Sequence, residues 1–311
     1  APLYAGRIPV LLVMGDDAGG LDANYHGTTV LTQILRGMWP ELRSHLEKAG
    51  LYEVCAIRPN NLSDLDDAFQ TLDTGTRKIA GFFHEIVMMN YGGTLLYPEY
   101  LRRAYALCRK HDVPTVADEI QSCAWAPDLF LFREFGLKPT FVALGKGFPG
   151  GEYPASRILF NASMDNGMPQ FGALVTNGQE EIASLAYLVT MRWVQANGQV
   201  VRRVGEDYAS RMCDLAAQFP EIIERTEGWG HLSTLVLHDL AVAKDVAARL
   251  VKMGLDISVQ SYKSDCPPAL LTKLPLTAGH EVVAFVAEKL ESVLHDMTQE
   301  ASGGEAAHGK T

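Results

Sequence analysis

Two short segments place charged side chains directly after apolar runs of the kind that form buried strands. In VPTVADEIQS, Asp118 ends an apolar run, Glu119 follows it, and Gln121 lies three residues after Asp118. In TFVALGKGFPGG, Lys146 follows a second apolar run and lies between two glycines. Open α/β sheets bind ligands beyond the carboxyl ends of their strands, and a lysine between glycines can approach a ligand with little steric hindrance. The two segments therefore predict a ligand site that contains a carboxylate and an amine.

Several known motifs for phosphate, metal or nucleophile sites do not fit these segments. A Walker A loop requires G-x-x-x-x-G-K-[ST], but Thr140 stands at the first glycine position and Gly147 at the hydroxyl position. The glycines of GKGFPGG introduce no evident helix, which a dinucleotide-binding loop requires. The chain has no H-x-x-x-H pair and no G-x-S-x-G turn, so we expect neither a metal site nor a serine hydrolase.

The elements that must position these residues alternate between strand and helix patterns. Near-continuous apolar runs predict strands covered on both faces, at residues 8–14, 53–57, 79–87, 114–118, 140–144 and 156–160. Amphipathic spacing predicts helices over residues 65–72 and 98–111, the second of which begins with proline and ends in cations. This alternation predicts an α/β fold, with a mostly parallel sheet sandwiched by helices.

The remainder of the chain has a different pattern. Residues 179–219 show a long helical pattern, followed by strand patterns at 232–237, 257–261 and 270–274 and helix patterns at 241–253 and 279–297. We therefore predict a large α/β domain over residues 1–190 and a smaller carboxyl-terminal α+β domain over residues 191–297. Residues 298–311 lack apolar periodicity, so we expect a disordered tail.

Composition and charge exclude several classes of protein. The 311 residues are 47% hydrophobic and 21% charged, as in ordinary globular proteins. A net charge of -10 opposes binding to nucleic acid or to an anionic membrane, and no apolar run approaches the roughly 18 residues of a membrane helix. The five cysteines are widely spaced without a C-x-x-C pair, and no signal peptide is evident, so we expect reduced thiols and a cytoplasmic location.

Four segments occur in an order and spacing that resemble one enzyme family. They are YHGTT at residues 25–29, KIAGFFHEIVMMNYGG at 78–93, EYLRRAYALCRKHDVPTVADEIQS at 99–122 and LGKGFPGGEYPASRILF at 144–160. They resemble the Y-H-G-R-T segment, the strand ending in glutamate, the D-E-V-Q-[ST] segment and the K-G-[LI]-x-G-G turn of the class III aminotransferases. The resemblance implies a pyridoxal-phosphate enzyme of fold type I, with an aspartate-aminotransferase-like large domain that binds the cofactor.

The resemblance also implies a role for each residue of the cofactor site. Lys146 would form a Schiff base with the aldehyde of pyridoxal 5'-phosphate and then move a proton between substrate and cofactor. Asp118 would pair with the pyridine nitrogen, and Gln121 would donate a hydrogen bond to the ring hydroxyl. Tyr25 would lie against the ring face, with His26 beside it in the same cofactor-binding segment.

On the substrate side, the resemblance implies roles for two further residues. Glu85 matches the family glutamate near the substrate, and Lys273 in LLTKLPLT is the nearest cation to the family's carboxylate-binding arginine. A polar strand end and a strand-edge lysine remain the alternative interpretations of these two residues. The resemblance further implies a homodimer that acts on small-molecule amine and oxo-acid substrates.

The chain departs from the family where the cofactor phosphate is bound. The family's G-[ST]-E-A turn is absent from the 24 residues before Tyr25, and Ala173 stands where the family has a phosphate-binding threonine. The leading hypothesis is an aminotransferase without the usual amino-terminal segment, which moves an amino group between an amino donor and a 2-oxo acid or aldehyde. Alternatives are a racemase, aminomutase or decarboxylase of the same fold, and a noncatalytic or partial chain that needs the missing segment.

Overall fold

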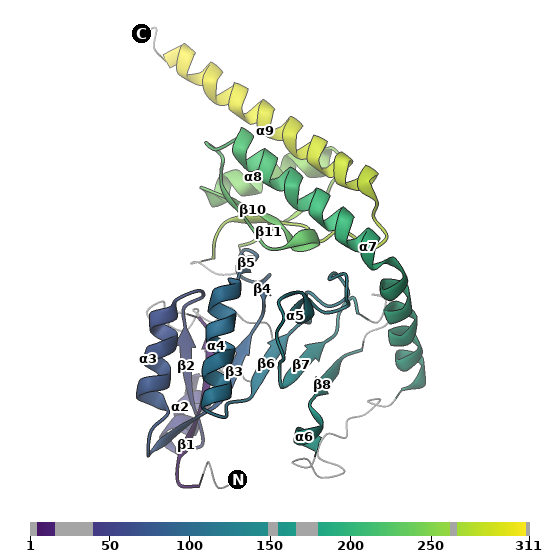
Figure 1. Ribbon diagram of the computed structural model, residues 1–311. Helices are drawn as coiled ribbons and strands as arrows, with labels where there is room; N and C mark the ends of the chain where they lie inside the picture. The colour runs from purple at the N-terminus through teal and green to yellow at the C-terminus, as the bar shows by residue number, and fades with distance from the viewer. Residues whose placement is uncertain (1–4, 16–39, 149–154, 166–179, 262–265, 309–311) are drawn as a thin grey trace. The chain divides into compact units, whose positions relative to one another are not determined.

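The computed structural model describes residues 5–15, 40–148, 155–165, 180–261 and 266–308 (Figure 1). The chain forms two compact units, residues 1–88 with 96–198 and residues 89–95 with 199–311. Each unit contains its own sheet. Within the described residues, no helix combines the length and the apolar character that crossing a membrane demands.

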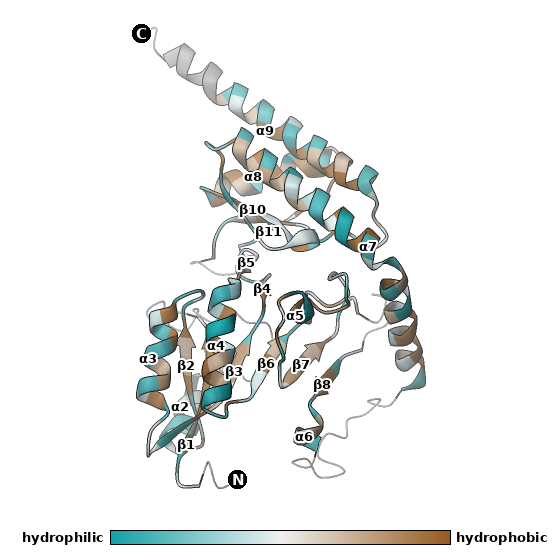
Figure 2. Cartoon of the chain, viewed as in Figure 1, coloured by the Kyte–Doolittle hydropathy of each residue, from teal (hydrophilic) through white to brown (hydrophobic). Residues whose placement is uncertain are grey.

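The first unit is built on a six-stranded sheet with the order β2-β1-β3-β6-β7-β8. Its strands are β1 (Ile8–Met14), β2 (Glu53–Ile57), β3 (Arg77–His84), β6 (Thr115–Asp118), β7 (Phe141–Leu144) and β8 (Arg157–Phe160). All neighbouring pairs are parallel except β7 and β8, which are antiparallel. The strands are largely hydrophobic in Figure 2, as expected for a sheet covered on both faces. The mostly parallel α/β sheet that the sequence predicts is confirmed.

Helices of the first unit begin where local capping chemistry favours it. They are α2 (Pro40–Lys48), α3 (Leu62–Leu72), α4 (Pro98–Lys110), α5 (Leu131–Glu134) and α6 (Ala162–Asp165). Two short strands, β4 (Val87–Met88) and β5 (Thr94–Leu95), lie between β3 and α4 in the sequence. The Asn61 side chain caps α3 by accepting from the Asp64 amide at 3.0 Å. Pro98 occupies the first turn of α4, where its missing N–H costs no hydrogen bond.

A buried cation ties α3, β3 and α4 together at one end of the sheet. The Lys78 side chain at the start of β3 is 2% exposed, and its Nζ donates to Asp73 Oδ1 at 2.9 Å and to the His111 carbonyl at 2.6 Å. The second oxygen of Asp73 bonds His111 Nδ1 at 2.6 Å. Burial acts to raise the pKa of Asp73, but the hydrogen bonds from Lys78 and His111 outweigh it and lower the pKa. Asp73 is therefore the counterion that makes this burial of Lys78 tolerable.

The second unit has a four-stranded antiparallel sheet with the order β11-β12-β10-β9. Its strands are β9 (Ile223–Glu227), β10 (Thr234–Leu237), β11 (Ser258–Val259) and β12 (Ala269–Leu271), and the 3-10 turn η3 spans Gly230–Leu232. Helix α7 (Glu181–Gln218) begins in the first unit and ends in the second, which also contains α8 (Leu240–Lys252) and α9 (His280–His308). The predicted α+β character is present, but β9 has no counterpart among the predicted strands.

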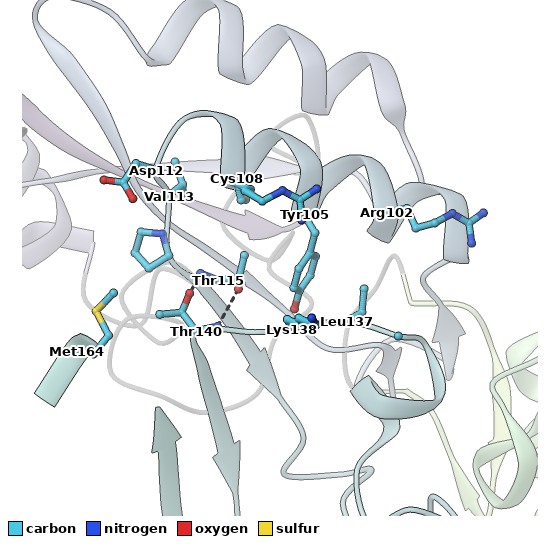
Figure 3. Close-up of a pocket in the computed structure, with 13 residues that line it drawn as sticks. Arg102, Tyr105, Cys108, Asp112, Val113, Thr115, Leu137, Lys138, Thr140 and Met164 are labelled. Atoms are coloured by element: carbon cyan, nitrogen blue, oxygen red, sulfur yellow. Dashed lines mark hydrogen bonds between the residues drawn. The ribbon is translucent and has the colours of Figure 1, made fainter. Parts of the chain in front are cut away.

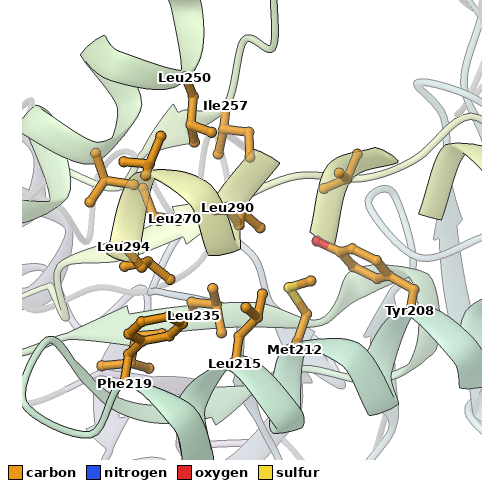
Figure 4. Close-up of a cluster of buried hydrophobic side chains, with 14 of the residues drawn as sticks. Tyr208, Met212, Leu215, Phe219, Leu235, Leu250, Ile257, Leu270, Leu290 and Leu294 are labelled. Carbon is orange, nitrogen blue, oxygen red and sulfur yellow. The ribbon is translucent and has the colours of Figure 1, made fainter. Parts of the chain in front are cut away.

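One hydrophobic cluster holds the second unit together (Figure 4). Its α7 members follow helical spacing and face the sheet and α9, as the labelled side chains of Tyr208, Met212, Leu215 and Phe219 show. Helix α9 continues past residue 297, where the sequence pattern ends it. Glu300 in this extension forms a bidentate ion pair, in which Arg249 of α8 donates to both of its oxygens at 2.8 Å.

Candidate active site

The carboxyl ends of three parallel strands lie at one edge of the first unit's sheet (Figure 1). In the strand register, His84 of β3 pairs with Ala117 of β6, and Asp118 pairs with Ala143 of β7. Glu85 and Asp118 directly follow the first of these pairs, and Lys146 lies just beyond the end of β7. The register therefore brings three of the sequence-predicted residues to the same sheet edge.

Asp118 is a half-buried carboxylate at the last position of β6. Its Oδ1 accepts a hydrogen bond from the Ile120 amide at 3.0 Å. Burial raises the pKa of Asp118, while this hydrogen bond and the positive charge of Lys146 oppose the increase. Asp118 is thus a carboxylate in a partly desolvated place, where its attraction to a positively charged partner is stronger than in bulk water.

Lys146 has an uncommon backbone conformation and an exposed side chain. Its φ angle is +50°, in the left-handed region that non-glycine residues seldom adopt. The Phe148 amide closes the turn by donating to the Gly145 carbonyl at 3.1 Å, and the buried Phe148 ring packs against Tyr187 with ring centroids 4.8 Å apart. Such conformations persist only where the surroundings impose them, and they cluster at functional sites.

Position 147, next to Lys146, must be glycine because the ring of Trp125 lies against it. A Cβ atom at this position would overlap the indole ring of Trp125. The residue after Lys146 must therefore lack a side chain for Trp125 to keep its place. Trp125 belongs to the loop that leaves β6, so the Asp118 and Lys146 segments are in direct contact.

Glu119 anchors the loop that follows Asp118, a role that the sequence analysis did not assign. Its buried carboxylate accepts from the Leu131 amide at 3.0 Å, from the Phe132 amide at 2.6 Å and from the Ser122 hydroxyl at 2.9 Å. Burial raises the pKa of Glu119 to about 7, against the effect of these three hydrogen bonds. The adjacency of Glu119 to Asp118 was the only signal in the sequence, because its backbone donors from α5 become neighbours only in the folded chain.

The other predicted site residues lie in different places. Gln121 is half-buried in the loop after Asp118, and Glu85 is buried at the end of β3. Lys273 is half-buried in the second unit, after β12. Tyr25 and His26 lie outside the described residues. Among the residues that the structure does describe, no cluster of His, Cys, Asp or Glu is arranged to hold a metal ion.

Comparisons with known proteins point to one family. A family model of the class-III aminotransferases matches residues 21–292. The chain is 25% identical over 251 residues to an ornithine aminotransferase of Schizosaccharomyces pombe, covering 78% of this chain and 56% of the relative. It is 22% identical over 235 residues to a diaminobutyrate–2-oxoglutarate transaminase of Vibrio cholerae, covering 73% of this chain and 57% of the relative. The chain thus spans little more than half the length of these curated relatives.

A solved structure shares the fold. It is an ornithine aminotransferase from Toxoplasma gondii, described as having partial occupancy of PLP at its active site. The TM-score is 0.72 at 18% sequence identity, and the match covers 95% of this chain and 65% of that chain. At this identity, the similarity establishes the common fold.

Proposed function

We propose, because the chain belongs to the class-III aminotransferase family, that it acts as a pyridoxal-phosphate-dependent aminotransferase. Its membership confirms the resemblance seen in the sequence motifs. The reaction would move an amino group between an amino donor and a 2-oxo acid or aldehyde. The observation that carries the proposal is the strand register, by which Asp118 and Lys146 belong to the ends of adjacent parallel strands.

Pyridoxal 5'-phosphate is the cofactor of this family, and the described residues fit its reactive half. A partly desolvated carboxylate stabilises the protonated form of a ring nitrogen, and Asp118 provides such a carboxylate. An aldehyde condenses with an accessible amine, and Lys146 provides such an amine on a turn between two glycines. When bound, the cofactor supplies the electron sink for a carbanion at the substrate carbon.

The chain's own residues would transfer protons and hold the cofactor ring. Lys146 Nζ would accept a proton from the substrate carbon and return it elsewhere, as a general base and acid. Gln121 would donate its amide N–H to the ring hydroxyl, which is supported by its place in the loop after Asp118. Tyr25 and His26 stay proposed contacts of the ring face, on the basis of the sequence motif.

The names of the relatives suggest the substrate class. The two relatives are named for ornithine and diaminobutyrate, and one of them for 2-oxoglutarate. We extend this to a diamino acid as amino donor and a 2-oxo acid as acceptor. Glu85 would face the substrate, which its burial at the same sheet edge supports. Lys273 would bind a substrate carboxylate through its point charge, with less geometric selectivity than arginine.

Apolar side chains exposed on the first unit support the proposed homodimer. The exposed fractions range from 42% to 65% for Ile158, Leu159 and Phe160 of β8 and for Ile182, Leu185, Leu188 and Val189 of α7. Both segments contain strongly hydrophobic stretches in Figure 2. Apolar surface of this kind is stabilised when another protein covers it, and a second copy is the partner we propose.

Light scattering coupled to size-exclusion chromatography tests the homodimer. We expect about twice the chain mass of 34.0 kDa, and a monomer for Leu185→Asp. Val251→Asp, at an exposed apolar position of α8 in the other unit, is the matched control and should stay dimeric. A wild-type protein found only at the mass of one chain would disprove the homodimer.

We also propose a cytoplasmic location. All five cysteines belong to the described residues, and none of them forms a disulfide there, which is the state that reducing compartments maintain. Fractionation of cells that express the protein would test this, and recovery in an oxidising compartment would contradict it.

A cofactor-binding experiment tests the proposed activity. The purified protein is incubated with pyridoxal 5'-phosphate, reduced with borohydride and mapped by peptide mass spectrometry. We expect a visible absorption band, and a reduced cofactor adduct on Lys146, that are both lost in Lys146→Ala and kept in the control Lys110→Ala. Asp118→Ala should keep the lysine adduct but lose amino transfer from ornithine to 2-oxoglutarate. Absence of the band in the wild type would favour a partial chain that is incomplete by itself.

A further inference from the structure

A cavity of about 650 Å³ lies in the first unit, beside α4 and at the amino ends of β6 and β7 (Figure 3). Thr115 is the first residue of β6, and Thr140 directly precedes β7; both line the cavity. Asp118 and Lys146 lie at the opposite ends of the same two strands. The cavity is therefore separate from the candidate active site.

Positive charge predominates around this cavity. Its lining contains Arg102, Arg109 and Lys138, against a single carboxylate, Asp112. All three cations are exposed, and none of them forms an ion pair with a carboxylate in the part of the chain that the structure describes. Arg102 and Arg109 are seven residues apart, two turns of α4, and so belong to one face of the helix. The local excess of positive charge thus contrasts with the net charge of -10 of the whole chain.

The remaining polar groups of the cavity are neutral. Burial raises the pKa of the Cys108 thiol to about 12 and also raises the pKa of Tyr105, so both stay protonated near neutral pH. The Tyr105 hydroxyl is 2.9 Å from Nε2 of the buried His84. No buried anion among these residues therefore offsets the cations at the rim.

Two threonines of the lining exchange hydrogen bonds with each other, and one of their hydroxyls adds a donor to the cavity. The Thr115 amide donates to Thr140 Oγ1 at 3.1 Å, and the Thr140 amide donates to Thr115 Oγ1 at 3.0 Å, as the dashed lines in Figure 3 show. Each hydroxyl oxygen accepts a backbone N–H, and the Thr115 hydroxyl is also hydrogen-bonded to the Tyr105 side chain, so the hydrogen of the Thr140 hydroxyl is the one that remains for another acceptor. The hydroxyl of Thr140 can in this way serve an oxygen atom of a ligand in the cavity.

We propose that this cavity is a second binding site, for a small organic anion that carries phosphate or carboxylate groups. Arg102 and Arg109 supply planar guanidinium groups suited to such oxygens, and Lys138 supplies a mobile positive charge. The volume lies within the range of about 300 to 1,000 Å³ that is usual for small-molecule pockets. The site requires no contribution from Lys146 or from the proposed aminotransferase reaction.

Calorimetric titration of the full chain with pyrophosphate and, separately, with citrate tests the proposal. The two probes distinguish a phosphate ligand from a carboxylate ligand. We expect one of them to bind, more weakly as the salt concentration rises, and to bind equally well when the protein is saturated with pyridoxal 5'-phosphate. Absence of binding by both probes, or competition with the cofactor, would overturn the proposal.

Variants of exposed residues locate the binding. Arg109→Ala combined with Lys138→Ala should weaken binding at least tenfold, whereas Lys110→Ala, at the neighbouring exposed cation outside the cavity, should leave it unchanged. Asp112→Asn should strengthen binding severalfold, because it removes the one opposing charge while asparagine tolerates the φ angle of +53° at this position. Equal effects of the double variant and of Lys110→Ala would overturn the assignment, and circular dichroism confirms that each variant is folded.

Discussion

Replacing Glu119 by glutamine removes a buried ionisable group while nearly conserving the shape of the side chain. Glu119 is 1% exposed, and its carboxylate accepts from two backbone amides and from the Ser122 hydroxyl. Burial raises its pKa from the ordinary value of 4.5 to about 7, and the charge of the adjacent Asp118 acts in the same direction. Glutamine titrates in neither the native nor the unfolded state, so the variant isolates this one ionisation.

The sign of the pH dependence follows from proton binding. Between pH 4.5 and 7, the native protein retains a proton on Glu119 that the unfolded chain has released, so its stability decreases as the pH rises. The difference between 7 and 4.5 corresponds to about 3 kcal/mol at about 1.36 kcal/mol for each pKa unit. The free energy of unfolding of the wild type, relative to Glu119→Gln, should therefore fall by about 3 kcal/mol across this range.

Urea denaturation followed by circular dichroism, from about pH 4.5 to about pH 8, measures this difference. Other titrating groups are common to both proteins and cancel when the two free energies are subtracted. Ser122→Ala removes a donor to the carboxylate, so it should move the titration of Glu119 to still higher pH. A difference that stays constant, or that grows in favour of the wild type as the pH rises, would refute the reasoning. It would mean that the three hydrogen bonds stabilise the ionised carboxylate at least as much as burial penalises it.

Three further predictions concern the same unit. Gly147→Ala should lower the melting temperature and weaken cofactor retention, because the new Cβ overlaps Trp125. Adding Trp125→Ala to this variant should partly restore both properties, as measured by thermal melts and cofactor absorbance. Asp73→Asn should cost about 3 to 5 kcal/mol in urea denaturation, because Lys78 is left buried without its counterion, and a loss below about 1 kcal/mol would contradict this. Burial lowers the pKa of His84 from 6.5 to about 4. As the pH falls through this range, the unfolded chain binds a proton that the native protein does not, so the wild type should lose stability relative to His84→Gln. Equal stability changes in the two proteins would disprove this.

Local patterns located most elements of the fold. The predicted strand at residues 8–14 matches β1, and that at residues 53–57 matches β2, because buried parallel strands are continuous apolar runs. The predicted helix at residues 98–111 differs from α4 only by one residue at its end. Proline near a helix start and cations near its end are local features, so the sequence alone reveals them.

Other elements depended on contacts that local patterns do not encode. Strand β9 was not predicted, because its sequence IERTE has one apolar residue followed by four polar or charged ones, and most of its side chains are only partly buried. The direction of β8 is antiparallel to β7, and no residue type in a short apolar strand specifies the direction of its partner. The extension of α9 includes the pairing of Glu300 with Arg249, whose positions are far apart in the chain.

For the candidate site, the sequence by itself determined which chemical groups are present and in which order they occur. The amine of Lys146, the carboxylate of Asp118 and the glycines beside the lysine follow from residue types and motif spacing. Only the tertiary structure decided that these groups share one sheet edge, that Lys146 adopts a positive φ angle and that Glu119 is buried. Strand register, backbone strain and desolvation arise from contacts between distant segments, so they exist only once the chain has folded.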